Sequence, residues 1–206
     1  MKIINRIKTY YNIFKNRNNV NRFLEIGPGE SRLKGFETMN IVNSKVTDYI
    51  LDARSKLPFP DETFDVIYAS HILEHIPWYQ TSYVLNEWQR ILKRNGRLEI
   101  WVPNGYKIAK AFVDAENGYN YIEEDGWYKF NEIKDPCIWA NGRIFTYGDG
   151  KGTLGHPNWH LSLFSSRYLK KLLIEAGFDK VRIMNSDEVR GYDHKWINLG
   201  VSGCKL

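Results

Sequence analysis

The amino-acid sequence predicts an α/β fold built on a doubly wound, mostly parallel sheet, and two observations support this. The first is the apolar segment of residues 23–26, which leads directly into Gly27 and Gly29. Glycine lets the backbone turn sharply and approach a ligand closely, so this segment is typical of a strand that ends at a nucleoside-containing cofactor. The second is the alternation of strand-like and helix-like segments along the rest of the chain, which such a sheet requires.

Each further element has its own local signal. Alternating apolar and polar residues indicate strands, and apolar residues three and four positions apart indicate helices. Asn95-Gly96 is expected to end one helix, Ser165 or Ser166 to cap the start of the last one, and Gly177 to follow its end. The expected order after the glycine loop is strand 47–51, strand 66–69, helix 78–93, strand 97–102, a helix over 107–113, a helix through 176, and strands 180–184 and 196–203.

The glycine loop by itself does not identify the cofactor. A dinucleotide-binding loop would carry a third glycine at position 32 and an acid at the end of the second strand. This chain has Arg32 and Asn40 at those places. The sequence therefore disfavours NAD.

The order of the motifs resembles that of the class I S-adenosylmethionine-dependent methyltransferases. The glycine loop is followed by Arg-Leu-x-Gly-Phe at residues 32–36, by Asp52 after a short strand, and by Ser-His-Ile-Leu-Glu-His at residues 70–75 after the next strand. The resemblance is clear over residues 20–112 and points to a small branch often associated with polysaccharide and glycan biosynthesis. It implies a Rossmann-like sheet of seven strands with an antiparallel last strand, in a single domain of residues 1–206.

The resemblance also implies where S-adenosylmethionine binds. The glycine loop would lie under the methionine and ribose, the residues after the third strand would hold the adenine, and those after the fourth would border the methionyl part. Asn40 departs from the family, which usually has an acid there for both ribose hydroxyls, because an amide offers one acceptor and no charge. Glu37 in a shifted register is the alternative. The implied residues are Glu25, Gly27, Pro28, Gly29, Asn40, Asp52, Ala53, Arg54, Ser70 and His71.

Methyl transfer to a hydroxyl needs the acceptor oxygen held in line with the methyl group and a base for its proton. His75, just past the fourth strand, is the first candidate, since an imidazole titrates near neutrality. His156 and His160 are its rivals, and a structural hydrogen bond is the other interpretation of His75. No metal is expected, because Pro157 separates the two later histidines and the acids of residues 123–125 are typical of a solvated charge run.

Residues 114–164 fit no regular periodicity and are rich in aromatic residues and glycine. Such a long insertion in a compact domain is usually functional, so we expect it to cap the site and bind the acceptor. Tyr128, Trp139 and Trp159 are the candidate acceptor-binding residues. The alternative is that these rings fill a small satellite core.

The first 19 residues predict an amphipathic helix. Six of the basic residues lie within residues 1–22, where there is no acid, so the rest of a chain of net charge +5 is nearly neutral. No broad basic surface is expected, which argues against a nucleic-acid partner. We expect the apolar face of the helix to pack on the domain. The alternative is peripheral contact of residues 1–17 with an anionic membrane where glycans are assembled.

The expected function is methylation of a sugar hydroxyl, for example on a 6-deoxyhexose such as rhamnose, in a glycan or glycan precursor. The resemblance suggests the sugar, and flat aromatic rings suit its apolar faces. Cys137 and Cys204 are far apart, which suggests reduced thiols and a soluble, cytoplasmic protein. Two alternatives remain open: a non-catalytic cofactor-binding domain of a larger glycan-assembly protein or complex, and a methyltransferase acting on nucleic acid or protein.

Overall fold

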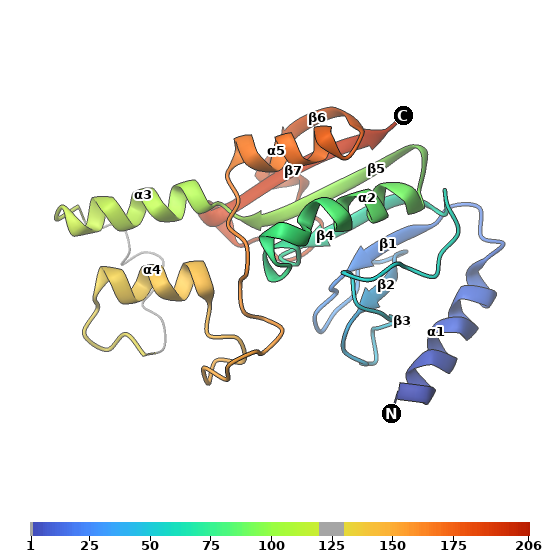
Figure 1. The fold of residues 1–206 in the computed structure, drawn as a ribbon, viewed down its shortest axis with the longest axis horizontal. Coiled ribbons are helices and arrows are strands. Elements are labelled where there is room, and N and C mark those ends of the chain that lie inside the picture. The colour runs from blue at the N-terminus through green and yellow to red at the C-terminus, as the bar shows by residue number, and fades with distance from the viewer. Residues whose placement is uncertain (1, 120–129) are drawn as a thin grey trace.

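The computed structural model describes residues 2–119 and 130–206, and its centre is a seven-stranded sheet (Figure 1). The strands are β1 (Phe23–Ile26), β2 (Glu37–Asn40), β3 (Tyr49–Ile50), β4 (Phe64–Ser70), β5 (Leu92–Pro103), β6 (Phe178–Met184) and β7 (Asn198–Lys205). They are arranged in the order β3-β2-β1-β4-β5-β7-β6. Strands β1 to β5 pair in parallel, whereas β7 is antiparallel to both β5 and β6. The prediction of a mostly parallel, Rossmann-like sheet with an antiparallel last strand is therefore confirmed.

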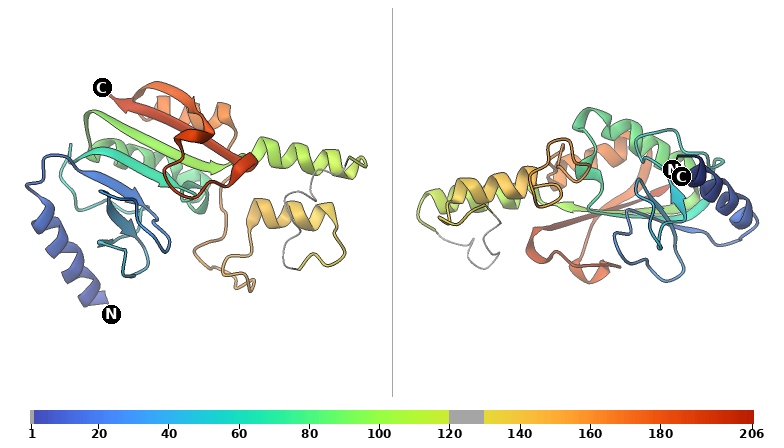
Figure 2. Two further views of the ribbon diagram at one scale, coloured as in Figure 1. Left: turned by 180° about the vertical axis from the view of Figure 1, so that it is seen from behind. Right: turned by 90° about the horizontal axis from the view of Figure 1, so that it is seen from below.

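The helices occupy three places around the sheet (Figures 1 and 2). Two of them, α2 (Thr81–Ile91) and α5 (Ser166–Glu175), cover one face. Two more, α3 (Gly105–Glu116) and α4 (Pro136–Phe145), extend beyond the carboxyl end of β5. Helix α1 (Lys2–Asn16) lies along β3 at the edge of the sheet. The 3₁₀ turns are η1 (Leu73–His75), η2 (Trp78–Gln80), η4 (Ser186–Glu188) and η5 (Lys195–Ile197).

The two faces of the sheet are covered differently. On the helix side, the main core packs strand residues such as Ile67 against Trp88 of α2, and both are completely buried. On the opposite side, the alternate strand residues Tyr68 and Trp101 pack against Phe36, which comes from the loop after β1. Loops rather than helices therefore cover this second face. One of them is the loop between β1 and β2, which carries the glycines.

The junction between α2 and β5 differs from the sequence-based expectation. The helix expected over residues 78–93 ends at Ile91, because Leu92 already has an extended backbone and pairs with Phe64 of β4. Asn95, expected to end the helix, has a φ of +60° and lies inside β5, where the pairing with β4 is irregular. By contrast, Ser165 caps α5 as predicted, by accepting a hydrogen bond from the backbone N–H of Tyr168, the third residue of the helix.

Helix α4 was not expected within residues 114–164. Its start follows ordinary capping rules, since the Asp135 side chain accepts a hydrogen bond from the N–H of Ile138 and a proline occupies the first turn. Helix α4 packs on α3, and the two share a small core in which Trp139 and Ile108 are completely buried. Part of this insertion therefore forms a satellite core, as the alternative interpretation proposed.

Helix α1 forms as predicted, but its polar side packs on the domain and its apolar side is exposed. Thr9 is 2% exposed, whereas Ile7, Tyr11 and Phe14 are 62–64% exposed. The expectation that the apolar face packs on the domain is therefore wrong. The physical reason is that the polar side of the helix hydrogen-bonds to β3 and the loop before it. None of the helices in the described part of the chain is long and apolar enough to cross a membrane.

Candidate active site

A cavity of about 720 Å³ opens where the first three strands end. One wall consists of the last residues of β1 and β2 together with the segment that follows β3, residues 51–54. A second part of the lining, the insertion wall, consists of Phe145 and residues 154–161, which come from the aromatic-rich insertion. Ile72, His75 and Ile76, from the segment after β4, also line the cavity. The cavity therefore joins the predicted cofactor-binding strand ends to part of the predicted acceptor-binding cap.

The glycine loop follows β1 in a conformation that only glycine adopts easily. Gly27 has a φ of +75° and donates its N–H to the carbonyl of Met39, with 2.8 Å between the two atoms. A Cβ at Gly27 would lie 1.9 Å from the end of the Ile72 side chain. Gly29 also has a positive φ, of +62°, but a Cβ there would meet nothing within 4 Å. The two glycines therefore serve different purposes: the first makes room beside the cavity and the second permits the turn.

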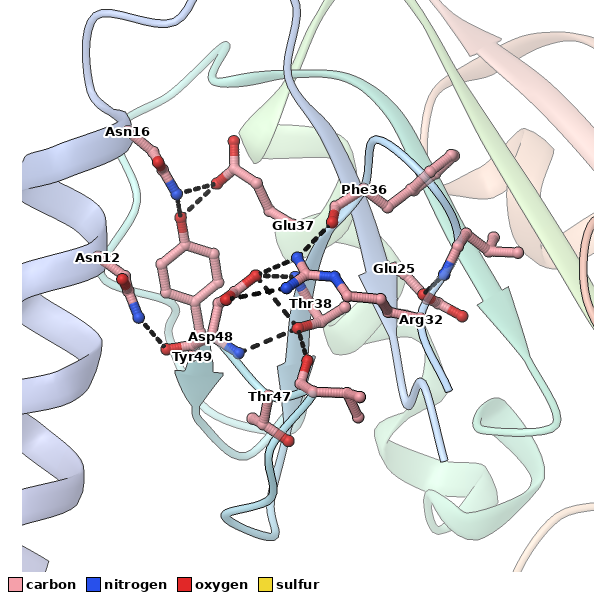
Figure 3. Close-up of polar contacts among 12 residues, drawn as sticks. Asn12, Asn16, Glu25, Arg32, Phe36, Glu37, Thr38, Thr47, Asp48 and Tyr49 are labelled. Carbon is pink, nitrogen blue, oxygen red and sulfur yellow. Dashed lines mark hydrogen bonds and ion pairs between the residues drawn. The ribbon is translucent and has the colours of Figure 1, made fainter. Parts of the chain in front are cut away.

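Glu25 stabilises the same loop through a hydrogen bond to its backbone. Its carboxylate accepts a hydrogen bond from the backbone N–H of Leu33 at 2.8 Å (Figure 3). The side chain is buried, and this burial raises the pKa of Glu25, although the Leu33 bond opposes the effect. The same loop is fastened by Arg32, which donates to the Phe36 carbonyl and to Asp48. Glu25 thus shapes the loop and lies outside the lining of the cavity.

Asp52 lies in the cavity wall directly after β3. Its carboxylate is held by Arg54, whose Nη2 lies 2.7 Å from Asp52 Oδ2 and whose backbone N–H donates to Oδ1 at 2.9 Å. The side-chain hydrogen bond from Arg54 lowers the pKa of Asp52, although burial acts in the other direction. The carboxylate is therefore ionised at neutral pH and fixed in the cavity wall. An exocyclic amine could donate a hydrogen bond to it while Arg54 remains bound.

We expect Asp52→Ala to weaken binding of S-adenosylmethionine by about 1 to 3 kcal/mol, because a partly buried acceptor for the adenine amine is lost. Isothermal titration calorimetry measures this effect. Arg54→Ala is the matched control, since it leaves the carboxylate in place and removes only its support. An equal loss of affinity in both variants would contradict direct recognition of adenine by Asp52.

Asn40 ends β2 and lines the cavity. Its side-chain Oδ1 accepts only a long hydrogen bond, of 3.4 Å, from the N–H of Val42. Glu37, the alternative ribose ligand, is at the other end of β2 and forms a buried ion pair with Arg22, with 2.8 Å between Arg22 Nε and Glu37 Oε1. Tyr49 also donates to Glu37. Glu37 is therefore held away from the cavity lining, which argues against the shifted-register alternative, and Asn40 is the side chain at the end of β2 that offers an amide to the cavity.

Asn40→Asp is expected to preserve or tighten binding of S-adenosylmethionine, because a carboxylate offers a second acceptor and a charge to the ribose hydroxyls. Calorimetry of the purified variant tests this. Asn40→Ala provides the reference for a side chain without any acceptor. A large loss of affinity in the aspartate variant, with its melting temperature unchanged, would mean that Asn40 donates a hydrogen bond or lies beside another anion.

Glu74, His75 and His160 form a cluster beside the cavity. One ligand-type atom of each lies within 4.8 Å of the others, and the rings of His75 and His160 have centroids 5.0 Å apart. Glu74 is 1% exposed, and neither carboxylate oxygen has a hydrogen-bond partner of good geometry among the residues that the structure describes. These three groups are also close enough together to bind a divalent cation. The sequence predicted no metal site.

The hydrogen bonds of the three candidate histidines distinguish them as bases. His75 Nδ1 lies 3.3 Å from the carbonyl of Trp159, so Nδ1 carries the proton and Nε2 is left as an acceptor. His160 donates to the backbone carbonyl of Arg143, and burial lowers its pKa. His156 instead uses Nδ1 to accept the N–H of Asn158, at 3.2 Å. All three line the cavity, but His75 and His160 are anchored as donors.

His71 points away from the cavity lining. Its Nδ1 is 3.2 Å from Glu74 Oε1, and its Nε2 is 2.9 Å from the side-chain oxygen of Asn198 in β7. Burial would lower the pKa of His71, but Glu74 outweighs it and the pKa is raised. The ring of His194 lies against that of His71, tilted by 31° with the centroids 3.7 Å apart, and burial together with the charge of His71 lowers the pKa of His194 to about 4. Glu74 therefore connects this buried network to the cavity.

The cavity brings together about half of the residues predicted for the site. Trp139 is not among them, since it is buried between α3 and α4, and Tyr128 lies outside the described residues. Sequence reasoning missed Glu74, whose position between two histidines was the available signal, and it included Phe145 only as one of the aromatic residues of the insertion, without choosing it as a site residue. The predicted residues in the lining are Gly27, Asn40, Asp52, Ala53, Arg54, His75, His156, Trp159 and His160, whereas Glu25, Pro28, Gly29, Ser70 and His71 lie outside it.

The cavity fits a nucleoside cofactor with an extended side chain. Its volume of about 720 Å³ lies within the usual range for small-molecule sites. Gly27 leaves space beside the backbone at the first strand end, Asn40 offers an amide at the second and Asp52 a carboxylate at the third. These polar groups are spaced along one wall, as a ribose and an adenine require.

Comparison with known proteins agrees with this geometry. Residues 24–100 match the family described as "Methyltransferase domain". The chain is 32% identical over 104 residues to an uncharacterised protein of Methanocaldococcus jannaschii, which covers 50% of this chain and 40% of that protein. It is 33% identical over 112 residues to a sterol 4-C-methyltransferase of Caenorhabditis elegans, which covers 54% of this chain and 30% of the other. The chain thus matches less than half the length of either curated relative.

Solved structures share the fold. A possible histamine N-methyltransferase of Thermotoga maritima, described as S-adenosylmethionine-dependent, superposes with a TM-score of 0.53 at 19% identity and covers 99% of this chain and 92% of its own. A methyltransferase of Methanosarcina mazei, described in the same way, gives 0.54 at 17% identity, with 94% and 97% covered. Residues 24–100 therefore resemble the methyltransferase domains in sequence, and the chain shares the fold of these solved methyltransferases.

Proposed function

We propose that the chain transfers a methyl group from S-adenosylmethionine to a sugar hydroxyl of a glycan or glycan precursor. The observation that carries this proposal is that His75 lines the same cavity as Asn40 and Asp52 and hydrogen-bonds to Trp159 of the insertion, with Nε2 left as an acceptor. The cofactor supplies an activated methyl group on a sulfonium. The acceptor oxygen forms the new bond to carbon, the carbon–sulfur bond breaks with its electron pair on sulfur, and the hydroxyl proton passes to His75 Nε2.

Two neighbours support His75 as the base. The Trp159 carbonyl fixes the ring orientation through Nδ1, so Nε2 is presented in one direction. The buried carboxylate of Glu74 lies in the same cluster and is ionised: burial would raise the pKa of Glu74, but the surrounding histidines lower it. His160, 5.0 Å away between ring centroids, is the second candidate in the same cluster.

The lining of the insertion wall supports an acceptor with an apolar face. Phe145, Leu154 and Trp159 line this wall together with polar groups such as Asn158. The Trp159 ring is held by a hydrogen bond from Nε1 to the Thr153 carbonyl at 2.7 Å, so it is a fixed flat surface. Flat rings stack on the apolar faces of sugars, and a 6-deoxyhexose adds a methyl group to such a face. This combination favours a deoxysugar over a charged acceptor.

A second candidate is methylation of an apolar ring system such as a sterol. The predominance of aliphatic side chains in the lining favours it, as does the 33% identity to a sterol 4-C-methyltransferase over 112 residues. This reaction would form a carbon–carbon bond at the acceptor. The two candidates therefore differ in the atom that receives the methyl group.

Methyl-labelled S-adenosylmethionine and a panel of acceptors test the proposal. The purified protein is incubated with mono- and oligosaccharides that include 6-deoxyhexoses, and with sterols in detergent, and products are analysed for O- or C-linked label. Calorimetry on the same preparation should detect S-adenosylmethionine and no NADH. Label on a sugar oxygen supports the proposal, and label on a ring carbon supports the second candidate. Cofactor binding without transfer to any acceptor would favour a non-catalytic binding domain.

A further inference from the structure

Helix α1 binds the domain through its polar side. Asn12 Nδ2 donates to the Asp48 carbonyl at 2.9 Å, and Asn16 Nδ2 donates to the Tyr49 hydroxyl at 3.0 Å (Figure 3). Thr9, which is buried, accepts the N–H of Ile50 at 2.9 Å. These bonds occupy groups along β3, the edge strand, and so protect that edge. Of the apolar side chains of α1, Ile13 also packs against the main core, so the docking of α1 does not involve the exposed ones.

The apolar side of α1 remains uncovered. Its large side chains are 55–67% exposed over three successive turns, which is unusual for a continuous stripe on a soluble surface. Because each residue turns a helix by roughly 100°, these side chains lie opposite the ones that bind β3. The stripe consists of Ile4, Ile7, Tyr10, Tyr11 and Phe14.

Positive charges flank this stripe on both sides. By the same helical geometry, Arg6 and Arg17 lie along one margin and Lys8 and Lys15 along the other. Arg17 stacks over the Phe14 ring at 3.7 Å, so its stem already follows the apolar surface. The first 22 residues contain no acid.

The acids in a surface groove beside the carboxyl end of α1 are already paired. The groove contains Asp61 and Glu62. Asp61 forms an ion pair with Arg90 at 2.7 Å, and Glu62 lies 3.7 Å from Arg94. They therefore do little to neutralise the cations of the helix.

We propose that α1 binds the surface of an anionic lipid bilayer. The helix lies in the plane of the interface, with the stripe inserted among the acyl chains and the flanking Lys and Arg side chains at the headgroups. Tyrosine and phenylalanine suit this depth, because their rings accept a boundary that is apolar on one side and wet on the other. The helix is too short to span the membrane, so the contact is peripheral.

A second copy of the chain fits this surface less well. Two such stripes packed face to face would bring both sets of cations together, and the segment offers no acid to pair with them. An anionic bilayer complements both the apolar stripe and its charged margins. The observed charge pattern therefore favours lipid over self-association.

Helix α1 contacts a loop that also contributes to the lining of the cavity. Lys8 Nζ donates to Asn43 Oδ1 and to the Ser44 carbonyl, each at 3.1 Å. This loop begins at Ile41, which lines the cavity and is 48% exposed. A single loop thus connects the helix to the cavity wall. The membrane contact itself does not depend on the methyl-transfer reaction proposed above.

Co-sedimentation with lipid vesicles tests the proposal. We expect the full chain to bind phosphatidylcholine vesicles that contain about one third phosphatidylserine at least 10-fold more tightly than vesicles of phosphatidylcholine alone, and to bind more weakly as salt is raised. Ile7→Ser/Tyr11→Ser/Phe14→Ser should reduce the affinity about 100-fold, because the inserted apolar area is lost. Tyr106→Ser/Ile174→Ser, at positions 68% and 59% exposed on other helices, is the matched control and should bind like the wild type.

A charge variant separates the two contributions. Arg6→Gln/Lys15→Gln should lower the affinity for anionic vesicles about 5-fold for each side chain removed and leave the weak binding to neutral vesicles unchanged. Calorimetry with S-adenosylmethionine shows that each variant is folded. Unchanged vesicle binding by the triple serine variant would overturn the proposal, as would a wild type that does not bind. A dimer that this variant dissociates, without vesicle binding, would assign the stripe to a second copy instead.

Discussion

His75→Ala should lower the turnover number about 10²- to 10⁴-fold and leave the affinity for S-adenosylmethionine nearly unchanged. A sugar hydroxyl has a pKa far above neutrality, so its proton must be removed as the oxygen attacks. In the variant no group replaces Nε2, whereas the strand ends that bind the cofactor are untouched. The lost hydrogen bond to the Trp159 carbonyl costs about 1 kcal/mol of stability, which a melting curve separates from the catalytic effect.

The neighbouring histidines provide the controls for this experiment. His156→Ala should change turnover by only a few-fold, because His156 Nδ1 is occupied by an N–H of its own loop. His160→Ala should have an intermediate effect through its place in the cluster. If all three variants were harmless at saturating acceptor, the hydroxyl acceptor would be abandoned for one that needs no base.

Chelation separates a base from a metal ligand. We expect EDTA to leave the wild-type rate unchanged, because the proposed reaction uses Nε2 of His75 as a proton acceptor. Loss of activity with EDTA, and recovery with Mg²⁺ or Mn²⁺, would instead make Glu74, His75 and His160 the ligands of a divalent cation. In that case His75→Ala would lower the affinity for the metal ion as well as the turnover number.

The sheet and the strand ends that line the cavity could be predicted because their signals are local. Asn40 is the last residue of β2 and Asp52 comes two residues after the end of β3, so their position in the sequence already places them at one edge of a parallel sheet. The N-cap at Ser165 is similarly encoded within one turn. Helix α4 escaped prediction because Gly142 interrupts its pattern and glycine-rich loops follow it.

The catalytic cluster and the orientation of α1 depend on tertiary contacts. No residue next to Glu74 in the sequence indicates that its side chain is buried. Nor does the sequence indicate that its carboxylate contacts His71 on one side and belongs to the cluster with His75 and His160 on the other. The apolar spacing of α1 was recognised, but periodicity shows only that two faces differ. Which face docks was decided by the unpaired groups of β3, which Thr9 and the asparagines satisfy.

The last prediction concerns the glycine loop, where Gly27→Ala is expected to weaken binding of S-adenosylmethionine about 10- to 100-fold. The added Cβ would lie 1.9 Å from Ile72 Cδ1 and 2.4 Å from Cγ1, so the Ile72 side chain must move, and Ile72 lines the cavity. Backbone strain adds to this, because φ is +75° at this position.

Gly29→Ala separates steric displacement from backbone strain. Gly29 has a similar positive φ, of +62°, but its Cβ would meet nothing within 4 Å, so this variant carries the strain alone. We expect it to lose about 1 kcal/mol of stability and only a few-fold of affinity. Gly27→Ala/Ile72→Ala should recover most of the lost affinity relative to Ile72→Ala, since the clashing atoms are gone. Equal affinity losses in the two glycine variants, or no recovery in the double variant, would show that the loop acts through its backbone conformation rather than through the space that Gly27 leaves beside Ile72.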